Sequence, residues 1–130
     1  MSVSNLISSD INSIDIPCTL SGAMTGGTSV NFKRFDNIVY LSFNFVNIPV
    51  SPGGLTITIT PDIPIPLQFK PTLFGVARPI SLTNNSLPDE GRLTVFANLS
   101  LMQIVRVSGG AFSGSVSIVD NCVIWRTYST

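Results

Sequence analysis

The chain has 130 residues, of which 44% are hydrophobic and 11% are charged, and its seven basic and seven acidic residues cancel. This length suits one domain with its own core, and the high hydrophobicity with low charge excludes a disordered chain. Basic residues occur singly apart from Lys33-Arg34. The chain therefore lacks the basic face with which nucleic-acid binders neutralise phosphates, and we expect no nucleic-acid partner.

The N-terminal region is rich in Ser and Asn, and it lacks the basic and apolar regions of a signal peptide. We interpret residues 1–14 as a flexible lead or a connection to an upstream segment and residues 15–130 as a single β-sandwich domain. The uncharged stretch 37–61 is interrupted by Asn, Pro and Gly long before the ~20 apolar residues of a transmembrane helix accumulate. The sequence thus predicts no signal peptide and no membrane insertion.

From residue 28 onward, apolar and polar residues alternate, which is typical of strands with one buried and one solvated face. The clearest strand is predicted at 38–46. Its inward side chains are expected to be Val39, Leu41, Phe43 and Phe45. Residues 55–60 alternate as strictly, with Leu55, Ile57 and Ile59 inward and threonines outward. Further strands are predicted at 28–34, 75–82, 92–98, 101–107, 115–119 and 122–128.

Turn-forming residues separate these strands. The predicted turns are Asn84-Asn85, Pro88-Asp89-Glu90-Gly91, Gly109-Gly110 and Asp120-Asn121. The proline-spaced segment 61–71 is expected to be extended and irregular, and to cross from one sheet to the other. No stretch has helical periodicity. About seven to nine short strands with such turns predict an all-β antiparallel sandwich, for which a jelly roll is the best single topology.

The sequence offers little catalytic chemistry. The absence of histidine removes Ser-His and Cys-His nucleophiles and most catalytic zinc sites. Asp89 and Glu90 lie in a predicted turn and would point apart, whereas glycosidase carboxylates face each other. No spaced Asp-x-Asp loop supports calcium binding, and no glycine pair belongs to a phosphate loop. We therefore expect a protein that is not an enzyme and has no cofactor and no metal.

Cys18 and Cys122 are too few for a disulfide scaffold and lack metal-ligand spacing. Each falls in a predicted terminal strand, so a disulfide that joins the two ends of the chain is one interpretation. Two buried free thiols that pack as small hydrophobic residues are the other interpretation, which we favour.

Several apolar residues fall on outward faces of the predicted strands. Either a second sheet or loop of the same chain covers them, or they form a subunit interface, because aromatic residues and low charge mark interface cores. The candidate interface residues are Ile38, Tyr40, Phe96, Trp125 and Tyr128.

The order of several segments carries a family resemblance. Residues 30–41 read as a polar strand, a short Asp-Asn turn and an apolar strand, and the alternating residues 55–59 follow. The segment 65–71 contains a Pro-x-x-Phe-x-Pro crossing, and 91–95 reads Gly-Arg-Leu-Thr-Val. Over residues 28–128 the chain resembles the C1q/TNF-like jelly-roll heads of fibre or collagen-like proteins of phages, large DNA viruses and virophages. It departs from them in its longer last strand, 122–128.

This resemblance implies a homotrimer that caps a stalk on the virion surface and is joined to an upstream stalk or another virion protein. It implies host attachment through a surface glycan or protein receptor. The candidate ligand-binding residues, chosen because polar loops on rigid sheets commonly carry binding sites, are Asn84, Asn85, Asp89, Glu90 and Arg92.

Two other functions fit the same sequence. A minor capsid or decoration protein would have a purely architectural role and would bind no ligand. A monomeric carbohydrate-binding module would expose an aromatic platform, for which the chain offers Trp125, Tyr40 and Tyr128.

Overall fold

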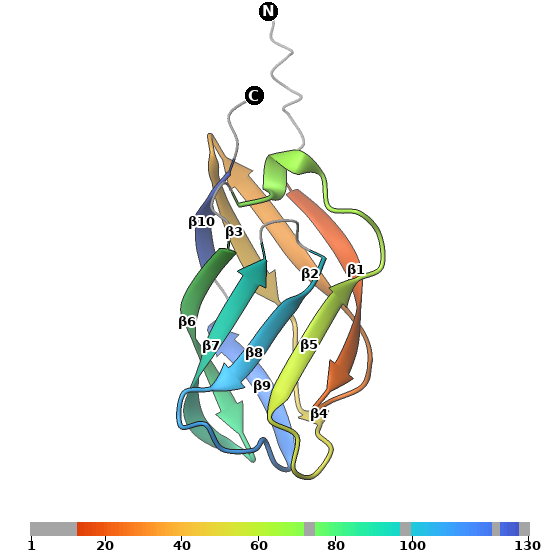
Figure 1. Ribbon diagram of the computed structural model, residues 1–130, viewed down its shortest axis with the longest axis vertical. Coiled ribbons are helices and arrows are strands. Elements are labelled where there is room, and N and C mark those ends of the chain that lie inside the picture. Colours follow the sequence, from red (N-terminus) through yellow and green to blue (C-terminus); the bar gives the residue numbers. More distant parts are fainter. Residues whose placement is uncertain (1–12, 72–74, 97–99, 121–122, 128–130) are drawn as a thin grey trace, which may run out of the picture.

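The computed structural model describes residues 13–71, 75–96, 100–120 and 123–127. Within these ranges the chain forms ten β-strands and one short 3-10 helix (Figure 1). In chain order the strands are β1 (Ser13–Gly22), β2 (Gly26–Phe35), β3 (Ile38–Phe43), β4 (Ile48–Pro49), β5 (Thr56–Pro61), β6 (Gly75–Asn84), β7 (Leu87–Phe96), β8 (Met102–Arg106), β9 (Ser115–Asp120) and β10 (Val123–Arg126). The helix η1 (Leu67–Phe69) lies between β5 and β6. The predicted all-β fold is confirmed.

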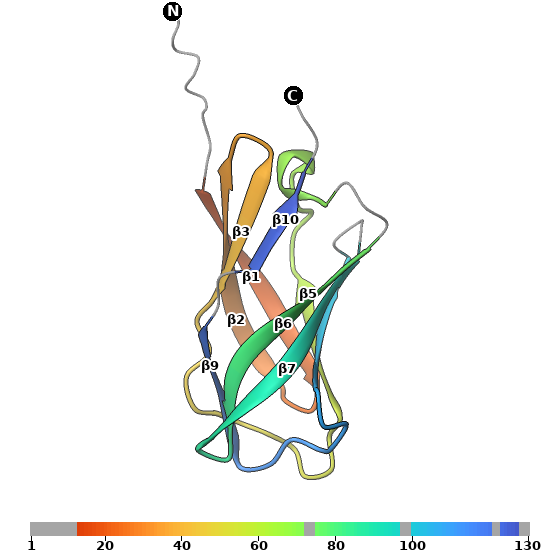
Figure 2. The ribbon, with the colours of Figure 1, turned by 90° about the vertical axis from the view of Figure 1, so that its left-hand side faces the viewer.

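The described strands form one antiparallel sheet in the order β10-β3-β2-β1-β5-β8-β7-β6-β9-β4. The sheet curls so that β10, β3, β2 and β1 face β5, β8, β7 and β6, as in a β-sandwich (Figures 1 and 2). Strands β1 to β3 follow one another as neighbours and β5 returns beside β1, which is the Greek-key order. Strands β6 to β8, with β9 beside β6, form a second Greek key.

Strands β9 and β10 close the curled sheet along part of its length. β9 pairs with β6, and its Ile118 N–H donates to the Phe45 carbonyl just beyond β3 at 3.1 Å. β10 continues along β3, whereas the first half of β6 pairs with β7 and with no other described strand. The Arg78 side chain spans this seam, and its Nε donates to the Ile124 carbonyl at 3.0 Å.

The strand alternation sets the core as the sequence predicts, with one exception. Val39, Leu41, Phe43 and Phe45 are all buried. In β5 the isoleucines are buried and the threonines face outward, as predicted. The inward prediction for Leu55 is wrong, because the pleat of β5 begins only at Thr56 and the Leu55 side chain is 57% exposed.

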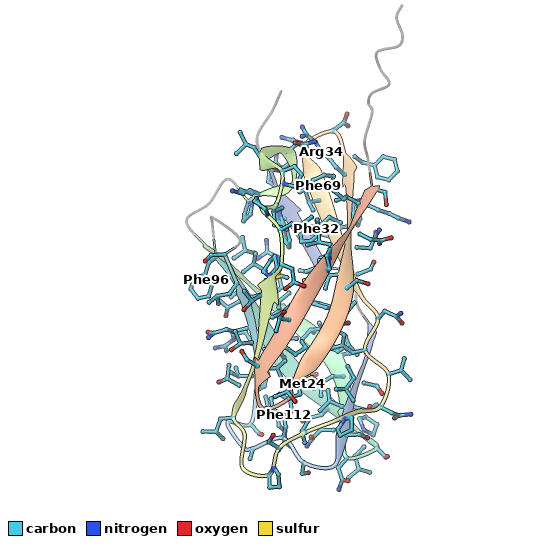
Figure 3. All side chains as sticks on the ribbon, turned by 90° about the vertical axis from the view of Figure 1, so that its right-hand side faces the viewer. Met24, Phe32, Arg34, Phe69, Phe96 and Phe112 are labelled. Carbon is cyan, nitrogen blue, oxygen red and sulfur yellow. The ribbon has the colours of Figure 1, made fainter. Side chains whose placement is uncertain are left out.

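Aromatic and sulfur-containing side chains fill the two ends of the core (Figure 3). At one end, Phe69 of η1 packs against Phe32, with ring centroids 6.1 Å apart, and Trp125 lies 6.0 Å from Phe32. At the other end, Met24 and Phe112 are fully buried. The segment 61–71 thus covers one end of a continuous sheet, and the predicted crossing between two separate sheets is not seen.

The predicted turn at Pro88-Asp89-Glu90-Gly91 is wrong, because these residues belong to strand β7. The turn lies earlier, at Asn85 and Ser86, whose φ values of 55° and 67° fit the type I′ turn of two-residue hairpins. Counting from this turn, the pair formed by Pro88 and Thr83 is a non-hydrogen-bonded pair. Proline is tolerated there because β6 needs no N–H from it.

The first described strand begins at Ser13, two residues inside the segment predicted as the lead; residues 1–12 lie outside the described residues. Cys18 of β1 is a buried free thiol. Burial, together with the charge of Asp62, raises the pKa of Cys18 to about 11. A free Cys18 agrees with the favoured interpretation of buried thiols and not with a disulfide that joins the two ends of the chain, while Cys122 itself lies outside the described residues.

Candidate functional site

The two ends of the sandwich differ in their connections (Figures 1 and 2). At one end, here called the terminal pole, lie the start of β1, the end of β10, the β2–β3 turn and η1. At the opposite end, the loop pole, lie residues 23–25, 44–55 and 107–114 and the Asn85-Ser86 turn. A partner at the loop pole would therefore not contact the start of β1 or the end of β10.

Backbone hydrogen bonds join the loops of the loop pole to one another. The Ala23 N–H donates to the Thr56 carbonyl at 2.7 Å, and the Ser51 N–H donates to the Ala23 carbonyl at 2.6 Å. The Phe112 N–H donates to the Gly54 carbonyl at 2.9 Å. Because these bonds cross-link three segments above buried Met24 and Phe112, the loop pole is a fixed surface on which side chains can be held in place.

An open hollow of about 720 Å³ lies beside this pole, between the β6–β7 hairpin and the chain that leaves β8. Its described lining residues are acidic, hydroxyl-bearing or apolar, and strand alternation places Asp89 in the inward row of β7 and Glu90 on the outer face. The lining residues are Ser81, Leu82, Thr83, Pro88, Asp89, Glu90, Val107 and Ser108. The Val107 N–H donates to the Glu90 carbonyl at 3.0 Å, which fixes the wall formed by residues 107–108 against β7.

An ion pair holds one side of the hollow. Arg106 Nε lies 2.5 Å from Asp89 Oδ2, and Arg106 Nη1 donates to the Ala111 carbonyl at 2.8 Å. Partial burial acts to raise the pKa of Asp89, but hydrogen bonds from Arg106 and from the Glu90 N–H, with the Arg106 charge, hold this pKa below its ordinary value. Asp89 is therefore ionised and its charge is compensated within the chain.

The structure brings together two of the five predicted ligand-binding residues, Asp89 and Glu90, on β7 and not in a loop. Asn84 is 7% exposed and its Oδ1 accepts a hydrogen bond from the Ser113 N–H at 2.9 Å, so it supports the loop pole from inside. Asn85 forms the hairpin turn. Arg92 is exposed on the outer face of β7, opposite Pro79 and Val105, and does not line the hollow.

Sequence reasoning missed Arg106 and the wall formed by Val107 and Ser108. A signal for Arg106 was present, because it continues the inward row of Met102 and Ile104 in β8. A charged side chain in such a row needs a partner, and Asp89 supplies it. No comparable signal marks Val107 and Ser108, whose position depends on how β8 pairs with β7.

Two predicted interface residues, Ile38 and Tyr40, are half-buried on the outer face of the sheet formed by β2, β3 and β10, beside two exposed apolar side chains. This outer apolar cluster consists of Phe35, Ile38, Tyr40 and Ile124. Phe35 is opposite Ile38 and its ring stands edge-on to Tyr40 at 6.2 Å, while Ile124 is opposite Tyr40. Phe35 is 67% exposed and Ile124 is 45% exposed. The cluster is continuous across three strands.

The other predicted interface residues do not join this cluster. Trp125 is 2% exposed, because the β10–β3 register turns it into the core, where its Nε1 donates to the Phe69 carbonyl at 3.0 Å. It is therefore unavailable both to a subunit interface and to the aromatic platform of a carbohydrate-binding module. Phe96 lies on the other side of the sandwich and is 39% exposed (Figure 3). Tyr128 lies outside the described residues.

The comparisons with known proteins identify no family: no protein-family model matches the chain, and no curated protein matches it. In the described part of the chain, no three His, Cys, Asp or Glu side chains come together as a metal site. None of the described helices is long and apolar enough to cross a membrane.

Proposed function

We propose that this chain is the head domain of a trimeric fibre on a virion surface and mediates attachment to the host through its loop pole. The observation that carries the proposal is the outer apolar cluster. Exposed apolar groups that are continuous over several strands mark protein–protein contacts, and aromatic side chains are enriched at the core of such contacts. Ile38 and Tyr40, which the sequence nominates for a subunit interface, lie at its centre.

The arrangement of the poles supports this proposal, which assigns stalk connection to the terminal pole and host attachment to the loop pole. An upstream stalk would enter at the terminal pole, where β1 begins, and would leave the loop pole facing outward. The two Greek keys are consistent with a jelly-roll relationship, because jelly rolls are built from two such units. The C1q/TNF-like resemblance of the sequence supports the same assignment.

The assembly part of the proposal is tested by paired substitutions read out by sedimentation velocity. Phe35→Ser and Ile124→Ser, each at the outer apolar cluster, are expected to shift the trimer toward a monomer. Leu87→Ser is the matched control, because Leu87 is equally exposed (65%) but lies beside the hairpin turn of the loop pole. If both cluster variants sediment as the unchanged protein does, the cluster is not the interface.

The attachment part is tested separately with fluorescently labelled protein on host cells and on a glycan array. We expect saturable binding that alanine substitutions in the loop pole reduce. A trimer that binds neither cells nor glycans would refute attachment and would favour the architectural capsid or decoration role.

A further inference from the structure

The chemistry of the hollow beside the loop pole restricts the ligand that it can take. The Asp89 side chain lies in the inward row of β7 and is already paired with Arg106. Glu90 is exposed, and no cation pairs with its side chain in the part of the chain that the structure describes. None of the described lining residues is basic, and Arg92, which is exposed on the same outer face of β7, forms no ion pair with Glu90. Among the described residues the hollow thus offers one carboxylate without an ion-pair partner, which disfavours an anionic ligand and favours a cationic one.

The other walls specify the shape of this cation. Pro88 and Val107 supply apolar surface, and Val107 is 56% exposed, whereas the Leu82 side chain is buried in the core. The hydroxyls of Ser81, Thr83 and Ser108 supply acceptors for N–H groups. None of the described lining residues is aromatic, so none offers a ring for a sugar to stack on. A flexible aliphatic chain that ends in an ammonium group matches these walls, because its stem is apolar and its head has three donors.

We propose that the hollow binds a lysine side chain presented by a partner protein. The lysine stem packs along Pro88 and Val107, and its ammonium group binds the Glu90 carboxylate. This inference rests on the proposed function in one respect, since it takes the loop pole as the face turned toward the partner.

The probe is Nα-acetyl-lysine methylamide, titrated into the ¹⁵N-labelled full chain and followed by amide chemical shifts. We expect saturable shifts at the amides of Glu90, Val107 and Ser108, and an affinity that falls as salt is raised, because the contact is a solvent-exposed charge pair. The same molecule with its ε-amine acetylated keeps the stem but loses the charge, and it is expected to cause no saturable shift.

Glu90→Gln removes the charge with little change of shape and is expected to weaken binding about tenfold or more, the value of a hydrogen bond to a charged group. Asp36→Asn is the matched control, because Asp36 is an exposed carboxylate in the β2–β3 turn at the opposite pole. It makes the same change of net charge and is expected to leave the affinity unaltered. The amide spectrum of each variant shows that it is folded.

The lysine assignment is overturned by an absence of saturable shifts, by equal shifts with the acetylated probe, or by unchanged binding to Glu90→Gln. Tighter binding of glucosamine than of the lysine probe would also overturn it, in favour of an amino sugar. A trimer that attaches to cells but ignores the lysine probe would leave the proposed function standing and refute only the ligand class.

Discussion

The side chains of Asp89 and Arg106 meet at 2.5 Å where strands β7 and β8 leave the core. Arg106 lies in the inward row of β8, opposite Gly91 of β7. A Cβ at Gly91 would lie 2.8 Å from Leu82 Cδ2 and 3.0 Å from the Val105 carbonyl oxygen, so a larger residue would crowd this position. The ion pair therefore satisfies a charge at the edge of the core and ties residues 107–111 to the hollow.

Removing Arg106 should destabilise the fold through Asp89. We expect Arg106→Met to lower the free energy of unfolding by about 1–3 kcal/mol, because the partly buried carboxylate loses its partner and the Ala111 carbonyl loses its donor. Urea unfolding is measured for Arg106→Met, for Asp89→Asn and for the double variant. The three changes in unfolding free energy together give the coupling energy between the two side chains. Strictly additive effects would show that the contact contributes no stability.

The same pair makes stability depend on pH. The pKa of Asp89 is lower in the folded chain than its ordinary value of 3.8, so the contribution is complete above pH ~4 and is lost as pH falls through the folded pKa. Asp89→Asn should therefore flatten the acid limb of a plot of unfolding free energy against pH. An acid limb identical to that of the unchanged protein would contradict this.

Trp125, the only tryptophan of the chain, should report a buried and hydrogen-bonded indole. Native fluorescence is expected to be blue-shifted from that of the unfolded chain and poorly quenched by acrylamide. Trp125→Phe keeps an aromatic ring but loses the donor to the Phe69 carbonyl, and it should cost about 1–3 kcal/mol from the lost bond and the smaller ring. Native emission like that of the unfolded chain would place the indole in water.

Gly22 and Gly53 have nearly the same positive φ but differ in how closely other atoms approach them. Comparing their alanine variants therefore distinguishes the cost of steric crowding from the cost of backbone strain. Gly22 and Gly53 have φ values of 83° and 82°, but a Cβ on Gly22 would lie 2.3 Å from the Thr56 carbonyl oxygen, whereas none of the described atoms lies within 4 Å of one on Gly53. We expect Gly53→Ala to cost about 1–2 kcal/mol and Gly22→Ala about 1–3 kcal/mol more. Equal losses in thermal or urea unfolding would contradict the close packing of Gly22.

The buried thiol of Cys18 should resist modification while the chain is folded. Its pKa of about 11 leaves little thiolate near neutral pH, and its burial excludes reagents. In a Cys122→Ser background, a thiol reagent at pH 8 is expected to react only as fast as the chain unfolds. Rapid labelling under native conditions would show that Cys18 is accessible.

The sequence was sufficient to predict most strands, because period-two alternation depends on neighbouring residues alone. It failed at β7, where Pro88 and Gly91 look like turn residues. Pro88 is tolerated at a non-hydrogen-bonded position, and Gly91 fits between Leu82 and the Val105 backbone. Both facts follow from pairing with distant strands, which local sequence does not contain.

The candidate site was predictable only in part for the same reason. Asp89 and Glu90 were chosen as loop residues, yet they line the hollow because the register of β7 with β8 brings Val107 and Ser108 to them. The last strand gave a similar ambiguity, since both of its faces carry large side chains. The pairing of Trp125 with Val39 determines which face of β10 points into the core, and it turns the indole inward.

The central claim is that this domain works as a trimer, and the most direct test is its solution mass by light scattering, at low concentration and with reductant present. The account predicts about 42 kDa, three times the 13.9 kDa of one chain. A stable species of 13.9 kDa would contradict it and would favour a monomeric carbohydrate-binding or capsid-docking module.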